Sequence, residues 1–378
     1  MNFYKRAVAR WPEPSEAKVS DLSEIDTTTL NIRNIIMGVH YSDYLQLEKI
    51  LNAQQPESDR QGIPAHDEML FIVIHQAYEL WFRQLLFEVD SVTGIFGQPM
   101  LNDNSPELQT IVHRLSRCVT ILKVLVHQID IMETMNPMDF QDFRDLLRPA
   151  SGFQSVQFKL LEARLGLRYQ QRYGQQYYLS QLRQEEIDRV KAAEAAPSLL
   201  ELLNAWLERM PIVDQAAADQ FWADYRARYQ SSLADAEKGN QQAFDAMFFG
   251  DAAIGAEKTG TGSNEARSLS PAACRSALFI MLYRGYPLLQ LPFQVLNQLL
   301  EIDEQLSTWR YRHMSMVHRT IGTRIGTGGS TGRDYLASAL EKHHLFREIA
   351  ALTSFLIQRK RLPELSAEIQ HRLGFTAA

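Results

Sequence analysis

Residues 309–336 read WRYRHMSMVHRTIGTRIGTGGSTGRDYL, a segment with a helical pattern that runs directly into a glycine-rich loop. Before its first glycine the segment contains no proline, and on a helix Trp309 and Met316 share the face of His313. That face is apolar apart from one imidazole. His318 lies five residues further on and is rotated by roughly 140° from His313 around a helix. One helix cannot present both histidines to one metal ion, so we expect only one of them to be a ligand.

The loop at 326–332, GTGGSTG, can bring backbone N–H groups and small hydroxyls close to a ligand, because glycine tolerates positive φ angles. It is not a Walker loop, which requires Gly-Lys-Ser/Thr at its end and a strand before it. It is not the dinucleotide fingerprint either, which counted from Gly326 would require glycine in place of Thr331. A flexible connector and a loop that closes over a ligand remain, and the neighbouring His313 favours the second.

The most apolar helical pattern lies at 68–92, EMLFIVIHQAYELWFRQLLFEVDSV, which contains no glycine or proline. Because it is hydrophobic on nearly every side, it predicts a helix buried all round. His75 shares a face of this helix with Phe71, Tyr78 and Phe82. A single histidine on an apolar face is more often a hydrogen-bonded core residue than a ligand.

Residues 137–155, PMDFQDFRDLLRPASGFQS, predict a short helix with Asp139 as its N-cap. On that helix Arg144 lies among apolar neighbours, and the alternative is an arginine in a surface ion pair. Ser151 and Gln154 fit a capping box that opens the next helix. The free N–H groups at such a helix start favour an anion.

These motifs together resemble the tryptophan 2,3-dioxygenases, a family of haem proteins. WRYRH with GTGGSTG, FIVIHQAYELWF and DFRDLLRPASGFQS stand in the family's order and at its approximate spacing, and the resemblance covers most of the chain. It implies an all-α fold, a helical-bundle haem dioxygenase with an accessory helical lobe. It also implies an enzyme that inserts both atoms of O₂ into the indole ring of L-tryptophan. The product would be N-formylkynurenine, formed in the first step of tryptophan catabolism by the kynurenine pathway.

The resemblance implies haem b, one per subunit, with His313 as the proximal ligand of the iron. Trp309, Ser151 and Gly152 would lie beside the cofactor. Lys159 departs from the family pattern, because many members carry arginine there, and this leaves a propionate contact at Lys159 open.

Substrate contacts follow from the same resemblance. His75 would act as the catalytic residue that accepts a hydrogen bond from the indole N–H, while Phe71 and Phe140 pack on the ring. Arg144 would hold the carboxylate, a role suited to the planar fork of a guanidinium. Thr327 would bind the ammonium group.

The pattern of residues 37–52 predicts one helix that starts at Ser42. Tyr41 and Tyr44 lie three residues apart in this segment and would share a face. Tyrosines at this spacing usually pack in a core. In the family, however, the N-terminal helix reaches a neighbouring subunit and its tyrosines line the indole pocket. The resemblance therefore implies a homotetramer with shared N-terminal helices.

The composition of the chain excludes several classes of protein. The 378 residues are 45% hydrophobic and 22% charged with a net charge of −6, which describes a globular protein and gives no sign of nucleic-acid binding. Cys118 and Cys274 form no disulfide framework, and there is no secretory signal, so we expect a cytoplasmic protein. Glycine and prolines interrupt 278–296, so no membrane segment is expected. We expect one domain over 1–378, with an accessory helical insertion at 180–270.

Three alternatives remain on the sequence alone. The first is a haem monooxygenase of the same superfamily that oxidises an indole derivative without cleaving the ring. The second is a di-iron carboxylate protein, which requires two inward-facing Glu-x-x-His pairs and two further glutamates; Glu341 and His344 form one such pair, on a charged segment. The third is a haem sensor or carrier, which would have little use for polar anchors such as Arg144 and Thr327.

Overall fold

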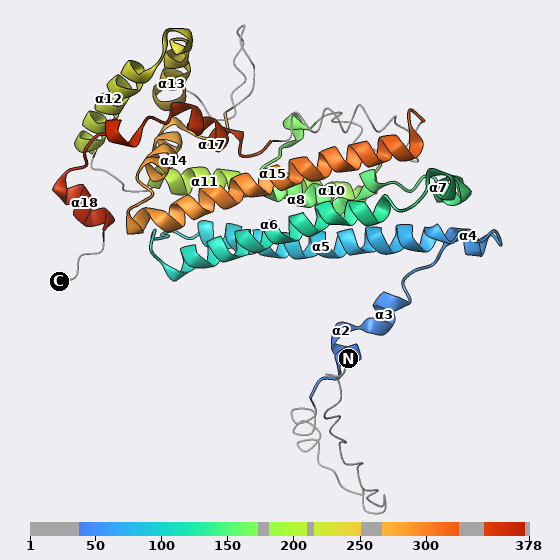
Figure 1. Cartoon of the computed structure of the whole chain (residues 1–378). Helices are drawn as coiled ribbons and strands as arrows, with labels where there is room; N and C mark the ends of the chain where they lie inside the picture. The colour runs from blue at the N-terminus through green and yellow to red at the C-terminus, as the bar shows by residue number, and fades with distance from the viewer. Residues whose placement is uncertain (1–37, 173–180, 210–214, 251–266, 325–343, 375–378) are drawn as a thin grey trace, which may run out of the picture. The chain divides into compact units, whose positions relative to one another are not determined.

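The computed structural model describes residues 38–172, 181–209, 215–250, 267–324 and 344–374. They belong to two compact units, Met1–Gln54 and Gln55–Ala378. Every regular element in these described ranges is an α-helix or a 3₁₀ helix (Figure 1). The predicted all-α fold is confirmed.

The first unit contains α2, Tyr41–Leu45, and α3, Leu47–Leu51. The prediction of one helix through 37–52 is wrong, because Gln46 breaks it in the left-handed region with φ 53°. The Gln46 backbone N–H donates to the Asp43 carbonyl at 3.3 Å, which closes a turn in place of continuing the helix.

Three long helices run side by side in the second unit: α5, Asp67–Phe96, α6, Pro106–Met132, and α15, Pro287–Ile321 (Figure 1). α6 packs against both of the others. Ser105 begins α6 by accepting a hydrogen bond from the Leu108 N–H at 3.3 Å, with Pro106 at the first helical position. The patterns at 68–92 and 309–320 lie within α5 and α15, so the helices predicted there are confirmed.

A run of short elements connects α6 to the next part of the bundle: α7, Pro137–Arg144, η1, Asp145–Leu147, η2, Gly152–Gln154, and α8, Val156–Leu165. Asn136, and not Asp139 as predicted, is the N-cap of α7. Asp139 is its reciprocal partner, because its carboxylate accepts from the Asn136 N–H at 3.3 Å.

The capping box of Ser151 and Gln154 is confirmed. It opens the single 3₁₀ turn η2, and Ser155 caps α8 separately. Arg148 and Asp145, on the turn between α7 and η2, form an exposed ion pair with their nearest N and O atoms 3.4 Å apart.

After α8 comes the short 3₁₀ helix η3, Tyr169–Gln171. The region from 184 to 282 then adds α10, Gln184–Ala195, α11, Leu199–Arg209, α12, Gln215–Ser232, η4, Asp235–Glu237, α13, Asn240–Phe249, and α14, Pro271–Leu282. α10 packs on α8, and α11 packs on α14 and α5. A short helix, α4, Glu57–Arg60, precedes α5. After α15 the described chain ends with α17, Arg347–Ala351, η5, Leu352–Phe355, η6, Arg359–Arg361, and α18, Ala367–Leu373.

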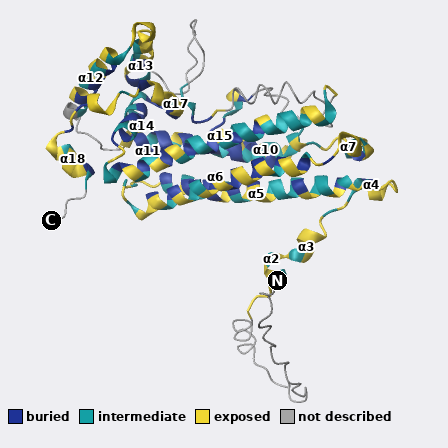
Figure 2. Ribbon diagram, in the orientation of Figure 1, coloured by how far each residue is buried: buried dark blue, intermediate teal, exposed yellow. Residues whose placement is uncertain are grey.

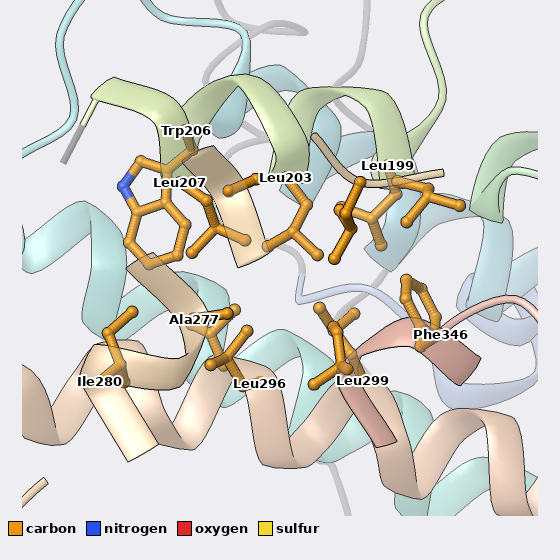
Figure 3. Close-up of a cluster of buried hydrophobic side chains, with 14 of the residues drawn as sticks. Leu199, Leu203, Trp206, Leu207, Ala277, Ile280, Leu296, Leu299 and Phe346 are labelled. Carbon is orange, nitrogen blue, oxygen red and sulfur yellow. The ribbon is translucent and has the colours of Figure 1, made fainter. Parts of the chain in front are cut away.

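The main core lies where α11, α14 and α15 meet. Leu203 and Trp206 of α11 face Ala277 of α14 and Leu296 and Leu299 of α15, and all are almost fully buried (Figure 3). Burying side chains of this size contributes about 1.5–3 kcal/mol each. The core therefore fixes the first half of α15 firmly.

One face of α5 is exposed. Figure 2 shows exposed positions along α5. Among them, Val73, Leu80 and Phe87 follow a seven-residue spacing and are 45%, 57% and 71% exposed. The prediction that this helix is buried all round is therefore wrong for a single chain, because the neighbouring helices cover only its other sides. None of the described helices has the length and apolarity that crossing a membrane requires.

Asp303 provides a test of the packing at the end of the chain. Its buried carboxylate accepts the N–H groups of Leu345 and Phe346 at 3.0 Å each, so it joins α15 to the segment before α17. Asp303→Ala leaves two buried donors without these acceptors and should lower the free energy of unfolding by roughly 2–4 kcal/mol. Urea unfolding measures this loss. The control is Asp235→Ala, which removes an exposed pair with Lys238 and should stay close to wild type. Equal losses would contradict the account of Asp303.

Candidate functional site

A cavity lies among α5, α6, α7, α8 and α15. Its empty volume is about 1770 Å³, part of it open to solvent. The enclosed part that a water-sized sphere can reach is about 290 Å³, close to the lower end of the about 300–1,000 Å³ that is typical of ligand pockets. The predicted site residues on its lining are Phe71, His75, Phe140, Arg144, Ser151, Gly152, Trp309 and His313.

His313 is held on the α15 side of the cavity. Its ring stacks on Trp309 with centroids 5.1 Å apart and planes 7° from parallel, and Trp309 in turn contacts Phe158 and Tyr78. These contacts fix the plane of the imidazole. Met316 lines the cavity on the same face, as the spacing predicts, whereas His318 is exposed.

The His313 imidazole is neutral and has a buried nitrogen to satisfy. Burial lowers the pKa of His313 to about 4, and His75 across the cavity lowers it further. Nδ1 of His313 is buried without a hydrogen-bond partner among the described residues. A buried polar atom of this kind requires an explanation, and a ligand in the cavity is the simplest one.

His75 has a defined proton arrangement. Its Nδ1 lies 2.7 Å from the Phe71 carbonyl oxygen, which only accepts, so Nδ1 carries the hydrogen. Burial lowers the pKa of His75, against smaller opposing effects of this bond and of Glu79. The ring is therefore neutral, and its Nε2 is an acceptor. This tautomer follows from the geometry and could not be read from the sequence.

The region around His75 is an apolar cluster that is separate from the main core. Phe71 lies 4.2 Å from His75 and 5.7 Å from Phe140 between ring centroids. Met132 and Met135 belong to the same cluster and line the cavity. This part of the cavity suits a flat aromatic ligand.

Arg144 brings a cation to the same region. It is the last residue of α7, it is only 4% exposed, and it lines the cavity beside the apolar cluster. The surface ion pair that the sequence left open for Arg144 is excluded by this burial. A planar guanidinium at the edge of an aromatic pocket suits a carboxylate.

The α8 wall is polar. Lys159 is buried and its Nζ donates to the Phe153 carbonyl within the turn that carries Ser151 and Gly152. Burial lowers the pKa of Lys159 to about 8, against the attraction of Glu162. Cationic character on this wall favours anionic groups in the cavity.

Sequence reasoning missed a buried ion cluster on the same wall. Glu162 accepts from Arg310 at 2.8 Å and from Arg172 at 2.6 Å, and Glu194 accepts from Arg172 Nε at 2.9 Å. Removing one partner of a buried pair typically costs about 3–5 kcal/mol. The partners Glu162 and Arg310 are 148 residues apart, so no local pattern could have found them.

Three of the predicted substrate contacts, Thr327, Tyr41 and Tyr44, are not among the described residues that line this cavity. Thr327 and its glycine loop at 326–332 lie outside the described residues. Tyr41 and Tyr44 belong to the first unit and are 71% and 73% exposed there.

No group of three or more His, Cys, Asp or Glu side chains that could hold a metal ion occurs in the described part of the chain. The di-iron alternative therefore has no ligand set there. His313 is a single imidazole, which suits a metal that arrives inside a cofactor.

The chain matches a family model described as tryptophan 2,3-dioxygenase over residues 25–356. A tryptophan 2,3-dioxygenase from Bdellovibrio bacteriovorus is 42% identical over 360 residues, which cover 89% of this chain and 98% of that protein. A protein of the same name from Dictyostelium discoideum is 38% identical over 390 residues, covering 96% of each. One from Xenopus laevis is 41% identical over 363 residues, covering 90% of this chain and 87% of that protein.

The lowered pKa of His313 predicts a pH dependence of the cofactor-free protein. Between its ordinary pKa of 6.5 and about 4, the unfolded chain binds a proton that the folded chain does not, so stability falls as the pH falls. His313→Gln should remove about 2–3 kcal/mol of this loss. Urea unfolding at several pH values across the window measures it. His318→Gln, at an exposed position, should keep the wild-type pH dependence, and the same result for His313→Gln would contradict the prediction.

Proposed function

The chain belongs to the tryptophan 2,3-dioxygenase family, and we infer that it is an oxidoreductase that cleaves the pyrrole ring of L-tryptophan with O₂. Both oxygen atoms enter the product, N-formylkynurenine. The observation that carries this inference is one cavity lined by a neutral acceptor, His75, a buried cation, Arg144, and a second imidazole, His313. The relatives give no support to the indole monooxygenase alternative.

Several residues on the cavity lining suit a haem group. His313 offers a neutral imidazole with its plane fixed by Trp309, and its buried Nδ1 calls for a ligand or partner. Ser151 and Gly152 lie on the lining beside Lys159, which supplies positive charge for carboxylate groups. We propose haem b, one per subunit, with His313 as the residue that would hold its iron. When bound, the haem supplies the iron that binds and activates O₂.

His75 would orient the substrate. With Nδ1 committed to the Phe71 carbonyl, its Nε2 can accept a hydrogen bond from the indole N–H. Burial keeps the ring neutral, so this acceptor is available at neutral pH. Phe71 and Phe140 would pack against the indole ring and exclude water from it.

The backbone of the substrate needs charged or polar partners at its other end. Arg144 would hold the carboxylate through two parallel N–H bonds, and burial strengthens such a contact. For the ammonium group we propose Thr327, which rests on the family motif in the glycine loop alone.

We also propose a homotetramer in which Tyr41 and Tyr44 reach the indole pocket of a neighbouring subunit. The support is their exposure within one chain and the exposed apolar stripe of Val73, Leu80 and Phe87 on α5. Surfaces of this kind are typical of protein–protein contacts.

A cytoplasmic location is proposed because Cys118 and Cys274 are both free and buried. A protein that is kept in a reducing compartment needs no disulfide for stability.

The function is tested by haem uptake and turnover. The purified protein reconstituted with haem should show a Soret band that shifts on reduction with dithionite, and with L-tryptophan and O₂ it should form N-formylkynurenine.

His313→Ala should lose haem or bind it weakly, whereas His318→Ala should keep a normal Soret spectrum because the His318 side chain is exposed and does not line the cavity. Equal haem loss in both variants would refute the assignment of the ligand. An oxygenated indole with an intact ring would instead support the monooxygenase.

The acceptor role of His75 gives a separate prediction. His75→Ala should retain haem but lose activity on L-tryptophan, by roughly 10–100-fold if one hydrogen bond to a buried group is lost. A 1-methylated tryptophan cannot donate this bond, so wild type and variant should differ much less on it. Steady-state rates on both substrates measure the difference. If the variant loses as much on the methylated substrate as on tryptophan, His75 does not accept the indole N–H.

A further inference from the structure

Glu162 connects two helices that both line the cavity, α8 and α15. α8 packs mainly on α5 and α10, and α15 packs mainly on α6, so neither is a main packing partner of the other in the described part of the chain. Glu162 of α8 nevertheless reaches Arg310 of α15, with Oε1 accepting from Nη2 at 2.8 Å. Its other oxygen accepts from Arg172 at 2.6 Å. All three side chains line the cavity and are no more than 5% exposed.

Arg310 is close to the imidazole that the proposed function assigns to the iron. It lies three residues before His313 on the same helix and directly follows Trp309, whose ring stacks on that imidazole. A rotation or slide of this end of α15 would move Arg310, Trp309 and His313 together. A buried, charge-assisted hydrogen bond is directional, so the bond to Glu162 opposes such a movement.

We propose that Glu162 is a positioning residue, which through Arg310 fixes the rotation of α15 and so the direction in which His313 presents its ring to the cofactor. The proposal rests on the proposed haem function. Glu162 does not itself contact the reacting atoms in this account.

The arrangement of the cluster supports a positioning role. Arg172 is also held by Glu194 at 2.9 Å and by the Lys159 carbonyl at 3.1 Å, so it remains attached to the α8 and α10 side when Glu162 changes. Among the described residues, the bond from Glu162 to Arg310 joins this cluster to α15. Buried ion pairs add little net stability compared with apolar packing, whereas they do fix geometry.

The test is Glu162→Gln, which keeps the size of the side chain and removes its charge. Two measurements are made on the haem-bound protein: the rate of haem transfer to an excess of apomyoglobin, and the iron–histidine stretching band of the ferrous form by resonance Raman spectroscopy. Haem transfer should be about 10–100-fold faster than in wild type, the usual effect of losing a group that orients a metal ligand. The stretching band should shift or broaden.

The matched control is Glu88→Gln. Glu88 is 2% exposed and pairs with Arg117 at 2.7 Å, but it does not line the cavity. It should lower the melting temperature and leave the haem transfer rate and the stretching band at wild-type values. Glu162→Gln and Glu88→Gln would behave alike if Glu162 only stabilised the fold, and that result would overturn the proposal.

Arg310→Lys provides a second variant in case Glu162→Gln does not fold. It keeps the charge but loses the planar fork, so it should shift the band in the same direction by a smaller amount. A wild-type band in Arg310→Lys would overturn the proposal while leaving the haem function intact. A wild-type protein that takes up no haem would overturn the proposed function and this proposal together.

Discussion

The packing of α15 against α6 is the interaction on which the rest of the structure depends. The first half of α15 is fixed in the main core by residues such as Leu296 and Leu299, which are about 1% exposed or less. The second half carries Trp309 and His313 into the cavity. Because a helix is stiff over this length, the core that holds one end also determines where the imidazole lies at the other.

Ion pairs also hold the end of α15 that lines the cavity. Arg312 donates to Asp130 at 2.6 Å and to Glu133 at 3.2 Å, both near the end of α6. Arg310, two residues away, points instead to Glu162 on α8. The two arginines therefore connect the same turn of α15 to different helices. Surface pairs of the first kind are weak singly, so the buried pair contributes the stronger restraint.

The sequence predicted the features that depend on local pattern. The helical face of His313, the placement of His318 on a different face and the capping box of Ser151 with Gln154 follow from spacing alone, and the structure agrees. The N-cap of α7 was misassigned because Asp139 and Asn136 both have suitable side chains and only their geometry tells which one precedes the first turn. Nothing in the composition of 37–52 marks Gln46 for a left-handed conformation.

Features that depend on the tertiary fold could not be predicted in this way. The bonds of Glu162 join residues that are distant in sequence, and the tautomer of His75 depends on the position of one carbonyl oxygen. The exposed face of α5 could not be predicted from the sequence of the helix either. Its residues are as apolar as a core, and whether they are buried depends on what packs there and not on the helix itself.

The methionines and Arg144 give different parts of the cavity wall unequal rigidity. Met132 and Met135 are unbranched and polarisable, so they can adopt new rotamers around an altered ring at little cost. An added methyl group in an apolar pocket changes binding by only about 1–3 kcal/mol even without such adjustment. Arg144, in contrast, offers a fixed planar fork. Under the proposed function, the enzyme would therefore be permissive toward substituents on the indole and strict toward the amino-acid backbone, so its selectivity would come from the part of the substrate that does not react.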